Sequence, residues 1–157
     1  MRRRNLLSAA PASGFSFIEL MIALLLVGVL VAIALPYYGD YRNRTKTLEA
    51  QRDIIGNEAR VEMWVSTHPG AYPDSLADLP GAATIDPWGN PYQYYNIDAN
   101  GKGHARKDHA LNPLNTDYDL YSMGPDGVSK SQITQKDSVD DIIRASNGGY
   151  VGVASGF

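Results

Sequence analysis

The chain has 157 residues and no cysteine, a length that suits one domain and an anchor. Without cysteine, disulfides, thiolate metal sites and cysteine nucleophiles are excluded. The first fourteen residues hold three arginines and no acid, which leaves 11 of the 14 basic residues against all 17 acidic ones, a balance of −6. Such an acidic body repels phosphate groups, so nucleic acid is not an expected partner.

Residues 1–14 are typical of a targeting segment, with Arg2, Arg3 and Arg4 followed by small residues and Gly14. In a standard secretory signal the apolar core precedes the cleavage site. Here Gly14 precedes the apolar core, so cleavage at this point would leave the core on the mature chain. The alternative interpretation is an uncleaved signal anchor in which Gly14 and Phe15 have no special role.

A long apolar run follows, and from Phe15 to Tyr38 its only charged residue is Glu19. As a helix rising about 1.5 Å per residue, this run is long enough to cross a bilayer. An unpaired carboxylate is costly in lipid and usually marks a function. We therefore expect Glu19 to bond to a partner after the helix has entered the membrane.

The segment Gly14-Phe15-Ser16-Phe17-Ile18-Glu19-Leu20-Met21 resembles the processing motif of type IV pilin-like proteins, which include pilins and the pseudopilins of type II secretion. The resemblance implies that a prepilin peptidase cleaves between Gly14 and Phe15 and methylates the new amino terminus. It also implies that Glu19 pairs with the terminal amine of a neighbouring subunit during assembly. A charge pair inside a low-dielectric helix bundle interacts far more strongly than the same pair in water.

Two small residues of the run, Gly28 and Ala32, share a helix face, where they either allow close helix packing or simply face lipid. Pro36 is predicted to kink or locally melt the helix. Basic residues flank both ends of the run, so charge alone does not set its orientation. The resemblance places the leader in the cytoplasm and the body in the periplasm.

The helix is predicted to continue as an amphipathic stem from Tyr37 to about Val65 and to end near Ser66. Its apolar stripe is expected to pack on a sheet, and it consists of Leu48, Ile54, Ile55, Ala59, Val61 and Val65. A short helical turn is predicted at Ser75–Leu79, and a strand at Tyr92–Ile97. The turn-rich segment Asp86–Tyr92 resembles the one that precedes the sheet in major pseudopilins.

The segment after this strand contains residues that could bind a metal. Asp98–Gly103 resembles the start of an EF-hand loop. The twelfth residue of such a loop must be acidic, but here it is His109, so the EF-hand is rejected. Asn100-Gly101 is instead predicted to form a hairpin turn. His104 and His109 either form a zinc-binding pair or belong to a solvated loop, which is the favoured interpretation.

Carboxylates gather near the C-terminal end of the chain. Tyr118–Met123 is predicted to be a strand, Gly124–Gly127 turns the chain, and Asp137, Asp140 and Asp141 follow. Carboxylates that converge repel one another unless a hard cation such as calcium lies between them. From composition alone, a solvated acidic loop is the favoured interpretation.

The region 119–142 resembles the calcium loop of major pseudopilins, through Asp119–Val128 and Ser138–Ile142. The resemblance implies a calcium ion that clips the loop to the sheet, bound by the Met123 carbonyl, Asp126, Ser138, Asp140 and Asp141. The spacing between Val128 and Ser138 is longer than in that family, and the tail 143–157 extends past its usual end. Asp137 is therefore an alternative ligand.

Taken together, these features predict an α+β, pilin-like fold in which a long N-terminal helix, half transmembrane, packs on a small antiparallel sheet. The predicted parts are a leader at 1–14, a transmembrane and assembly helix at 15–38, and a periplasmic body at 39–157, helical to about residue 66. No nucleophile–base pair or phosphate loop is visible, so an enzyme is not expected.

The expected function is that of a structural subunit in the periplasmic pseudopilus of a type II secretion system, anchored in the inner membrane before assembly. The resemblance implies a homopolymer formed through the N-terminal helices, with membrane lipid, a prepilin peptidase, minor pseudopilins and an inner-membrane assembly platform as partners. Two alternatives stay open. One is a type IV pilus subunit for adhesion, motility or DNA uptake, and the other is a membrane-anchored periplasmic binding module that does not polymerise.

Overall fold

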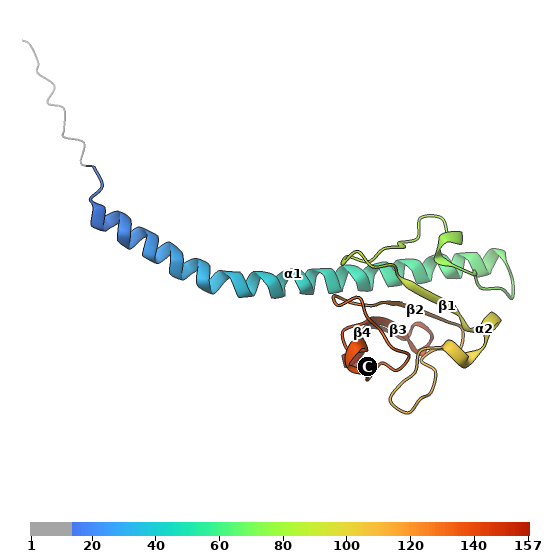
Figure 1. Cartoon of the computed structure of the whole chain (residues 1–157). Helices are drawn as coiled ribbons and strands as arrows, with labels where there is room; N and C mark the ends of the chain where they lie inside the picture. The colour runs from blue at the N-terminus through green and yellow to red at the C-terminus, as the bar shows by residue number, and fades with distance from the viewer. Residues whose placement is uncertain (1–13) are drawn as a thin grey trace, which may run out of the picture. The chain divides into compact units, whose positions relative to one another are not determined.

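The computed structural model describes residues 14–157, so most of the predicted leader lies outside the described residues (Figure 1). The chain divides into a first unit that ends at Asp40 and a second unit, the body, that spans Tyr41–Phe157. The long helix α1, Phe17–Thr67, contributes to both units.

The first part of α1 is apolar enough to cross a membrane. Its best 18-residue window has a mean hydropathy of 2.9, and none of that window is buried within the chain. Large apolar side chains such as Leu24 and Leu30 are 72% and 67% exposed. Side chains of this kind require lipid or neighbouring helices around them. The helix is continuous through residue 36, so the predicted local melting at Pro36 is wrong.

The body part of α1 buries a narrow face against the sheet. Ala50, Ile54, Asn57 and Val61 are at most 1% exposed, and their spacing places them on one side of a helix. The predicted packing of Ile54 and Val61 on the sheet is confirmed. The same prediction for Leu48, Ile55 and Ala59 is wrong, because all three side chains are exposed. The buried face passes through the polar Asn57, which a search for apolar residues cannot include.

Asn57 can be buried because its side chain forms two hydrogen bonds with the backbone of Ala83. Its Nδ2 donates to the Ala83 carbonyl at 2.8 Å, and its Oδ1 accepts from the Ala83 amide at 2.9 Å. These bonds attach the segment around Ala83 to the helix. The short turn η1, Leu76–Asp78, confirms the predicted helical turn, and a reciprocal capping box between Ser75 and Asp78 begins it.

The sheet has four antiparallel strands in the order β1-β2-β3-β4. The strands are β1, Gln93–Asn96, β2, Tyr118–Ser122, β3, Ile142–Ala145, and β4, Tyr150–Val153. Tyr94 pairs with Leu120 and Ile142 pairs with Val153. The predicted α+β fold is therefore confirmed, as are the strands expected near 92–97 and 118–123. The C-terminal tail supplies β4 and most of β3.

The predicted hairpin turn at Asn100-Gly101 is wrong. The Asn96 side chain accepts a hydrogen bond from the Ala99 amide at 3.0 Å and so caps a short helix, α2, Ile97–Asn100. Gly101 ends this helix with a φ of 76°, a conformation that suits glycine. A single turn, η2, Lys102–His104, follows, and the chain reaches β2 through a longer connection.

Apolar side chains pack on both faces of the sheet. Ile142 joins the cluster that contains Ile54 and Leu120, between α1 and the sheet. The next residue, Ile143, points to the opposite face and joins a second cluster with Leu114, Ile133, Ala145 and Ala154. Figure 1 shows the body part of α1 lying along the sheet.

One buried cation links the helix to the sheet. Arg144 in β3 donates from Nε to Glu58 of α1 at 2.8 Å and from both Nη atoms to Asp117 at 2.8 and 2.9 Å. Its guanidinium also lies 4.0 Å from the centre of the Tyr118 ring. Burial opposes its charge, but the hydrogen bonds that it donates to Asp117 and Glu58 more than compensate, and the pKa of Arg144 is raised. A Cβ at Gly148 would collide with the Glu58 carboxylate.

Replacing Arg144 should therefore destabilise the body strongly. We expect Arg144→Met to lower the free energy of unfolding by about 3–5 kcal/mol, because Glu58 and Asp117 would stay largely buried without their counter-ion. Tryptophan fluorescence of the full-length protein in detergent micelles measures this change, since Trp64 and Trp88 both lie in the body. The control Arg52→Met removes an exposed arginine of the same helix and should change stability by about 0.5 kcal/mol or less.

Candidate functional site

The predicted processing site is accessible. Gly14, Phe15 and Ser16 precede α1 without regular structure, and Phe15 is 82% exposed. A Cβ added at Gly14 would meet no atom within 4 Å. The fold itself therefore does not require glycine at this position, and the requirement has to come from whatever recognises the segment.

Ser16 and Glu19 form a reciprocal capping box at the start of α1. The Ser16 amide donates to Glu19 Oε2 at 2.8 Å, and the Glu19 amide donates to Ser16 Oγ at 3.3 Å. This satisfies amides that have no partner within the helix. The pattern Ser-x-x-Glu is the standard sequence signature of a capping box, and it was not recognised in the sequence.

This geometry gives Glu19 a role within its own chain. Its carboxylate lies at the positive end of the helix dipole, which stabilises a negative charge. It is also bonded to the residue next to Phe15, whose nitrogen becomes the amino terminus if the chain is cleaved after Gly14. The predicted contact between Glu19 and the amine of a neighbouring subunit is not tested by a single chain and stays a prediction.

The segment Asp86–Tyr92 forms a turn that is attached to the end of β2. Asp86 Oδ1 accepts from the amides of Trp88 and Asn90, at 3.0 and 2.8 Å. Its Oδ2 accepts from Ser122 Oγ at 2.5 Å, and Ser122 Oγ in turn accepts from the Gly124 amide. This turn therefore holds the first residues of the predicted calcium loop.

Two of the predicted calcium ligands already have backbone partners. Asp126 Oδ1 accepts from the Val128 amide at 2.8 Å. Ser138 Oγ accepts from the Lys130 amide at 2.8 Å and donates to the Lys130 carbonyl at 3.1 Å. Asp137, the alternative ligand, lies 3.9 Å from the Lys130 ammonium in an exposed pair.

Asp140 and Asp141 are adjacent in sequence but have different surroundings. Asp140 packs on Gly124, and a Cβ added at Gly124 would lie only 2.6 Å from the Asp140 carbonyl oxygen. Burial raises the pKa of Asp140, and the negative charge of Asp126 adds to this effect. Asp141 is fully buried, and its Oδ2 lies 2.6 Å from Arg106 Nη2. Burial raises the pKa of Asp141, although Ser129 and Arg106 oppose the shift.

The arrangement does not fit the predicted calcium ligand set. Calcium takes six to eight oxygen ligands, and the predicted site used three carboxylates. Asp126 and Asp137 both add to the raised pKa of Asp140, while Asp141 is paired with a guanidinium. Within residues 14–157, no group of three or more histidine or acidic side chains is placed to hold a metal ion. Calcium binding therefore stays a prediction from the resemblance.

His104 and His109, the two histidines considered as zinc ligands, have contacts that do not indicate metal binding. His104 packs edge-on against the Tyr95 ring, with centroids 6.2 Å apart. The His109 carbonyl accepts a hydrogen bond from Gln132 at 3.1 Å. Both residues are exposed, as the solvated-loop interpretation expects.

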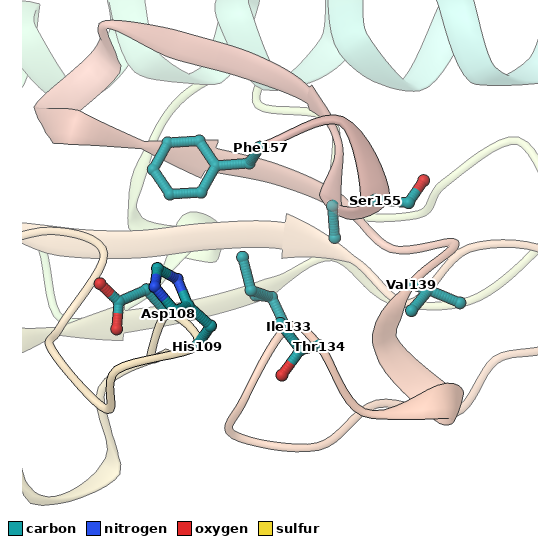
Figure 2. A pocket seen from close by; sticks show the side chains of 8 residues that line it. Asp108, His109, Ile133, Thr134, Val139, Ser155 and Phe157 are labelled. Atoms are coloured by element: carbon teal, nitrogen blue, oxygen red, sulfur yellow. The ribbon is translucent and has the colours of Figure 1, made fainter.

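A hollow of about 400 Å³ lies beside the second apolar cluster and is lined by side chains that include Asp108, His109, Ile133 and Phe157 (Figure 2). Asp108 is not available as a base, because its carboxylate accepts from the amides of Asn112 and Ala110 and so holds a turn. These hydrogen bonds, that of Asn112 first, lower the pKa of Asp108. The hollow therefore shows no arrangement suited to catalysis.

Comparison with known proteins finds relatives of this chain. Residues 10–35 match the model of the prokaryotic N-terminal methylation motif. Over 136 residues the chain is 27% identical to the type II secretion system core protein G of Pseudomonas aeruginosa, which covers 73% of this chain and 84% of that protein. The core protein G of Aeromonas hydrophila is 26% identical over the same shares. The chain is therefore similar to type IV pilin-like proteins, and its similarity to core protein G extends over most of its length.

Fimbrial proteins match a shorter part of the chain. The fimbrial protein EcpC of Eikenella corrodens is 40% identical over 73 residues, which cover 46% of this chain and 47% of that protein. No solved structure matches the chain. Since pilin-like proteins are structural subunits, this pilin-like chain is a membrane-anchored structural protein and not an enzyme.

The open surroundings of Gly14 lead to a test of processing. We expect Gly14→Val to leave the thermal unfolding of the body unchanged and to prevent cleavage, because the added side chain meets no atom of the fold but does alter the recognised segment. Mass spectrometry of the intact protein should show residues 15–157 plus one methyl group for the wild type and the full chain for the variant. A wild-type chain that keeps residues 1–14 in its native host would support the uncleaved signal anchor instead.

Proposed function

We propose that this pilin-like protein is the major subunit of a pseudopilus, the periplasmic fibre of a type II secretion system. The observation that carries the proposal is its similarity to core protein G, which extends over 73% of the chain and therefore includes much of the body. The similarity to fimbrial proteins covers less than half of the chain.

The local structure supports this function in two ways. The turn Asp86–Asn90, which resembles the segment before the sheet in major pseudopilins, is bonded to Ser122 at the end of β2. The chain has no cysteine and so cannot close its C-terminal loop with the disulfide that many pilins use. The body is stabilised by apolar clusters and buried ion pairs instead.

In the proposed pathway, a prepilin peptidase recognises the exposed segment around Gly14 and Phe15. The apolar part of α1 then holds the subunit in the inner membrane, with the body in the periplasm. During assembly the Glu19 carboxylate exchanges its bond to the Ser16 amide for one to the amine of a neighbouring subunit. The inner-membrane assembly platform and minor pseudopilins are the proposed partners in this step.

Glu19 is suited to such an exchange because its intrachain partner is a neutral amide. The bond to this amide is already charge-assisted, but a neighbouring ammonium group would add the direct attraction between two full opposite charges. Inside a bundle of apolar helices, little water competes for the pair. The helix therefore keeps its carboxylate satisfied in lipid and gains energy when a second subunit arrives.

A type IV pilus subunit is the second candidate, and the 40% identity to fimbrial proteins favours it. The two functions differ in what is lost when the gene is deleted. A pseudopilin mutant retains its secreted proteins in the periplasm, whereas a pilus mutant loses surface fibres but still secretes. A binding module that does not polymerise would form no fibre in either case.

The capping box allows the charge of Glu19 to be tested separately from its role in the helix. Glu19→Gln keeps an oxygen that can accept from the Ser16 amide, but it removes the negative charge. We expect this variant to insert into the membrane and to reduce fibre yield at least about tenfold, since a loss of 1.4 kcal/mol per contact suffices for that change. Fibres sheared from overexpressing cells and quantified by immunoblot provide the measurement.

Ser16→Ala is the matched control, because it removes the serine half of the capping box and leaves the carboxylate charged. It should assemble nearly as well as the wild type. The opposite result, with normal fibres from Glu19→Gln and few from Ser16→Ala, would show that Glu19 acts only within its own helix.

A further inference from the structure

The Arg106 guanidinium pairs with Asp141, one of the residues that the resemblance implies as a calcium ligand. Its side chain is 4% exposed, and its Nη2 lies 2.6 Å from Oδ2 of the fully buried Asp141. Its Nη1 donates to Ser129 Oγ, which itself donates to Asp141 Oδ2 at 2.6 Å. The carboxylate predicted to bind a metal therefore has a cation and a hydroxyl as its partners.

Arg106 is also held firmly from its other sides. Its backbone amide donates to Asp119 Oδ2 at 2.6 Å, which attaches it to β2. Its guanidinium lies 4.1 Å from the centre of the Tyr121 ring, within the range of a cation–π interaction. The side chain thus contacts β2, Ser129 within the loop that leads to β3, and Asp141 directly before β3.

The extra length between Val128 and Ser138 explains how this contact is possible. The Lys107 amide donates to the Ser131 carbonyl at 2.8 Å, and the Ile133 amide donates to the Lys107 carbonyl at 3.0 Å. Ile133 is buried in the second apolar cluster. The long loop therefore pairs with the segment around Arg106 and brings Ser129 to the guanidinium.

Asp141 is a position where a missing counter-ion would be costly. Its carbonyl accepts from the Ala154 amide at 2.8 Å, so its backbone attaches β3 to the end of β4. A buried carboxylate without a partner strongly destabilises a fold, whereas a guanidinium stays charged at all physiological pH values. A calcium ion beside Asp141 would be repelled by this guanidinium at short range.

We propose that Arg106 is the internal cation that closes the loop between β2 and β3, so that this body folds and assembles without calcium. The salt bridge with Asp141 and Ser129 replaces the metal clip that the resemblance implies. This property does not depend on whether the fibre is a pseudopilus or a pilus.

The first test measures the full-length protein in detergent micelles by tryptophan fluorescence during heating. The unfolding midpoint should be the same in EDTA, in millimolar calcium chloride and in magnesium chloride at equal ionic strength. A calcium site filled well above its dissociation constant would raise the midpoint by several degrees. Such a rise in calcium alone would overturn the proposal.

The second test removes the guanidinium. We expect Arg106→Met to lower the unfolding midpoint and to speed amide hydrogen exchange in residues 123–141 by about a hundredfold or more, because breaking a buried ion pair exposes the loop. The control Lys130→Met removes a half-exposed cation from the same loop and should leave both measurements nearly unchanged. Native stability and protection in Arg106→Met would contradict the proposal.

Two further variants keep this test decisive. Arg106→Lys retains a charge but loses the second donor of the fork, so its midpoint should fall between those of the wild type and Arg106→Met. If Arg106→Met does not fold, the double variant Arg106→Met with Asp141→Leu should recover folding, because both charges are then absent. A double variant that remains unfolded while the wild type responds to calcium would favour the metal.

Discussion

The position of helix α1 on the sheet depends on the guanidinium of Arg144. This group reaches from β3 to Glu58 on α1 and to Asp117 before β2, segments that are separated by up to 86 residues. The apolar cluster between helix and sheet provides most of the attraction, but that attraction is not directional. The planar guanidinium has fixed donor directions, so it selects one arrangement of helix and strands.

Local patterns in the sequence were sufficient to predict much of the fold. The apolar run, the end of α1 near Thr67, the turn at Leu76–Asp78 and the first two strands all follow from periodicity and turn residues within a few positions. The failures occurred where a polar side chain took part in the local structure. Asn57 shifted the buried face of α1, and Asn96 began a helix where a strand and hairpin were expected.

The carboxylates near the C-terminus show a second limit of such prediction. Their spacing located a negatively charged region correctly but did not reveal its counter-ion. Asp141 pairs with Arg106, which precedes it by 35 residues in a segment that was interpreted as a solvated loop. Glu19 shows the converse case, because its capping partner Ser16 is only three residues away and matched a known pattern. Long-range pairs require the topology, whereas local ones require only that the pattern be recognised.

An arginine side chain and a bound calcium ion differ as counter-ions for a buried carboxylate. The Arg106 and Asp141 pair is not fully bonded, since Arg106 Nε and Asp141 Oδ1 have no hydrogen-bond partner among the described residues. Unsatisfied buried atoms lower stability by about 1–3 kcal/mol each, and this cost remains in the arginine-paired arrangement. The guanidinium is nevertheless attached to the chain and needs no free ligand, so its contribution does not vary with calcium concentration. For a subunit that moves from membrane to fibre, as proposed for this chain, a constant counter-ion keeps the body in one structure throughout.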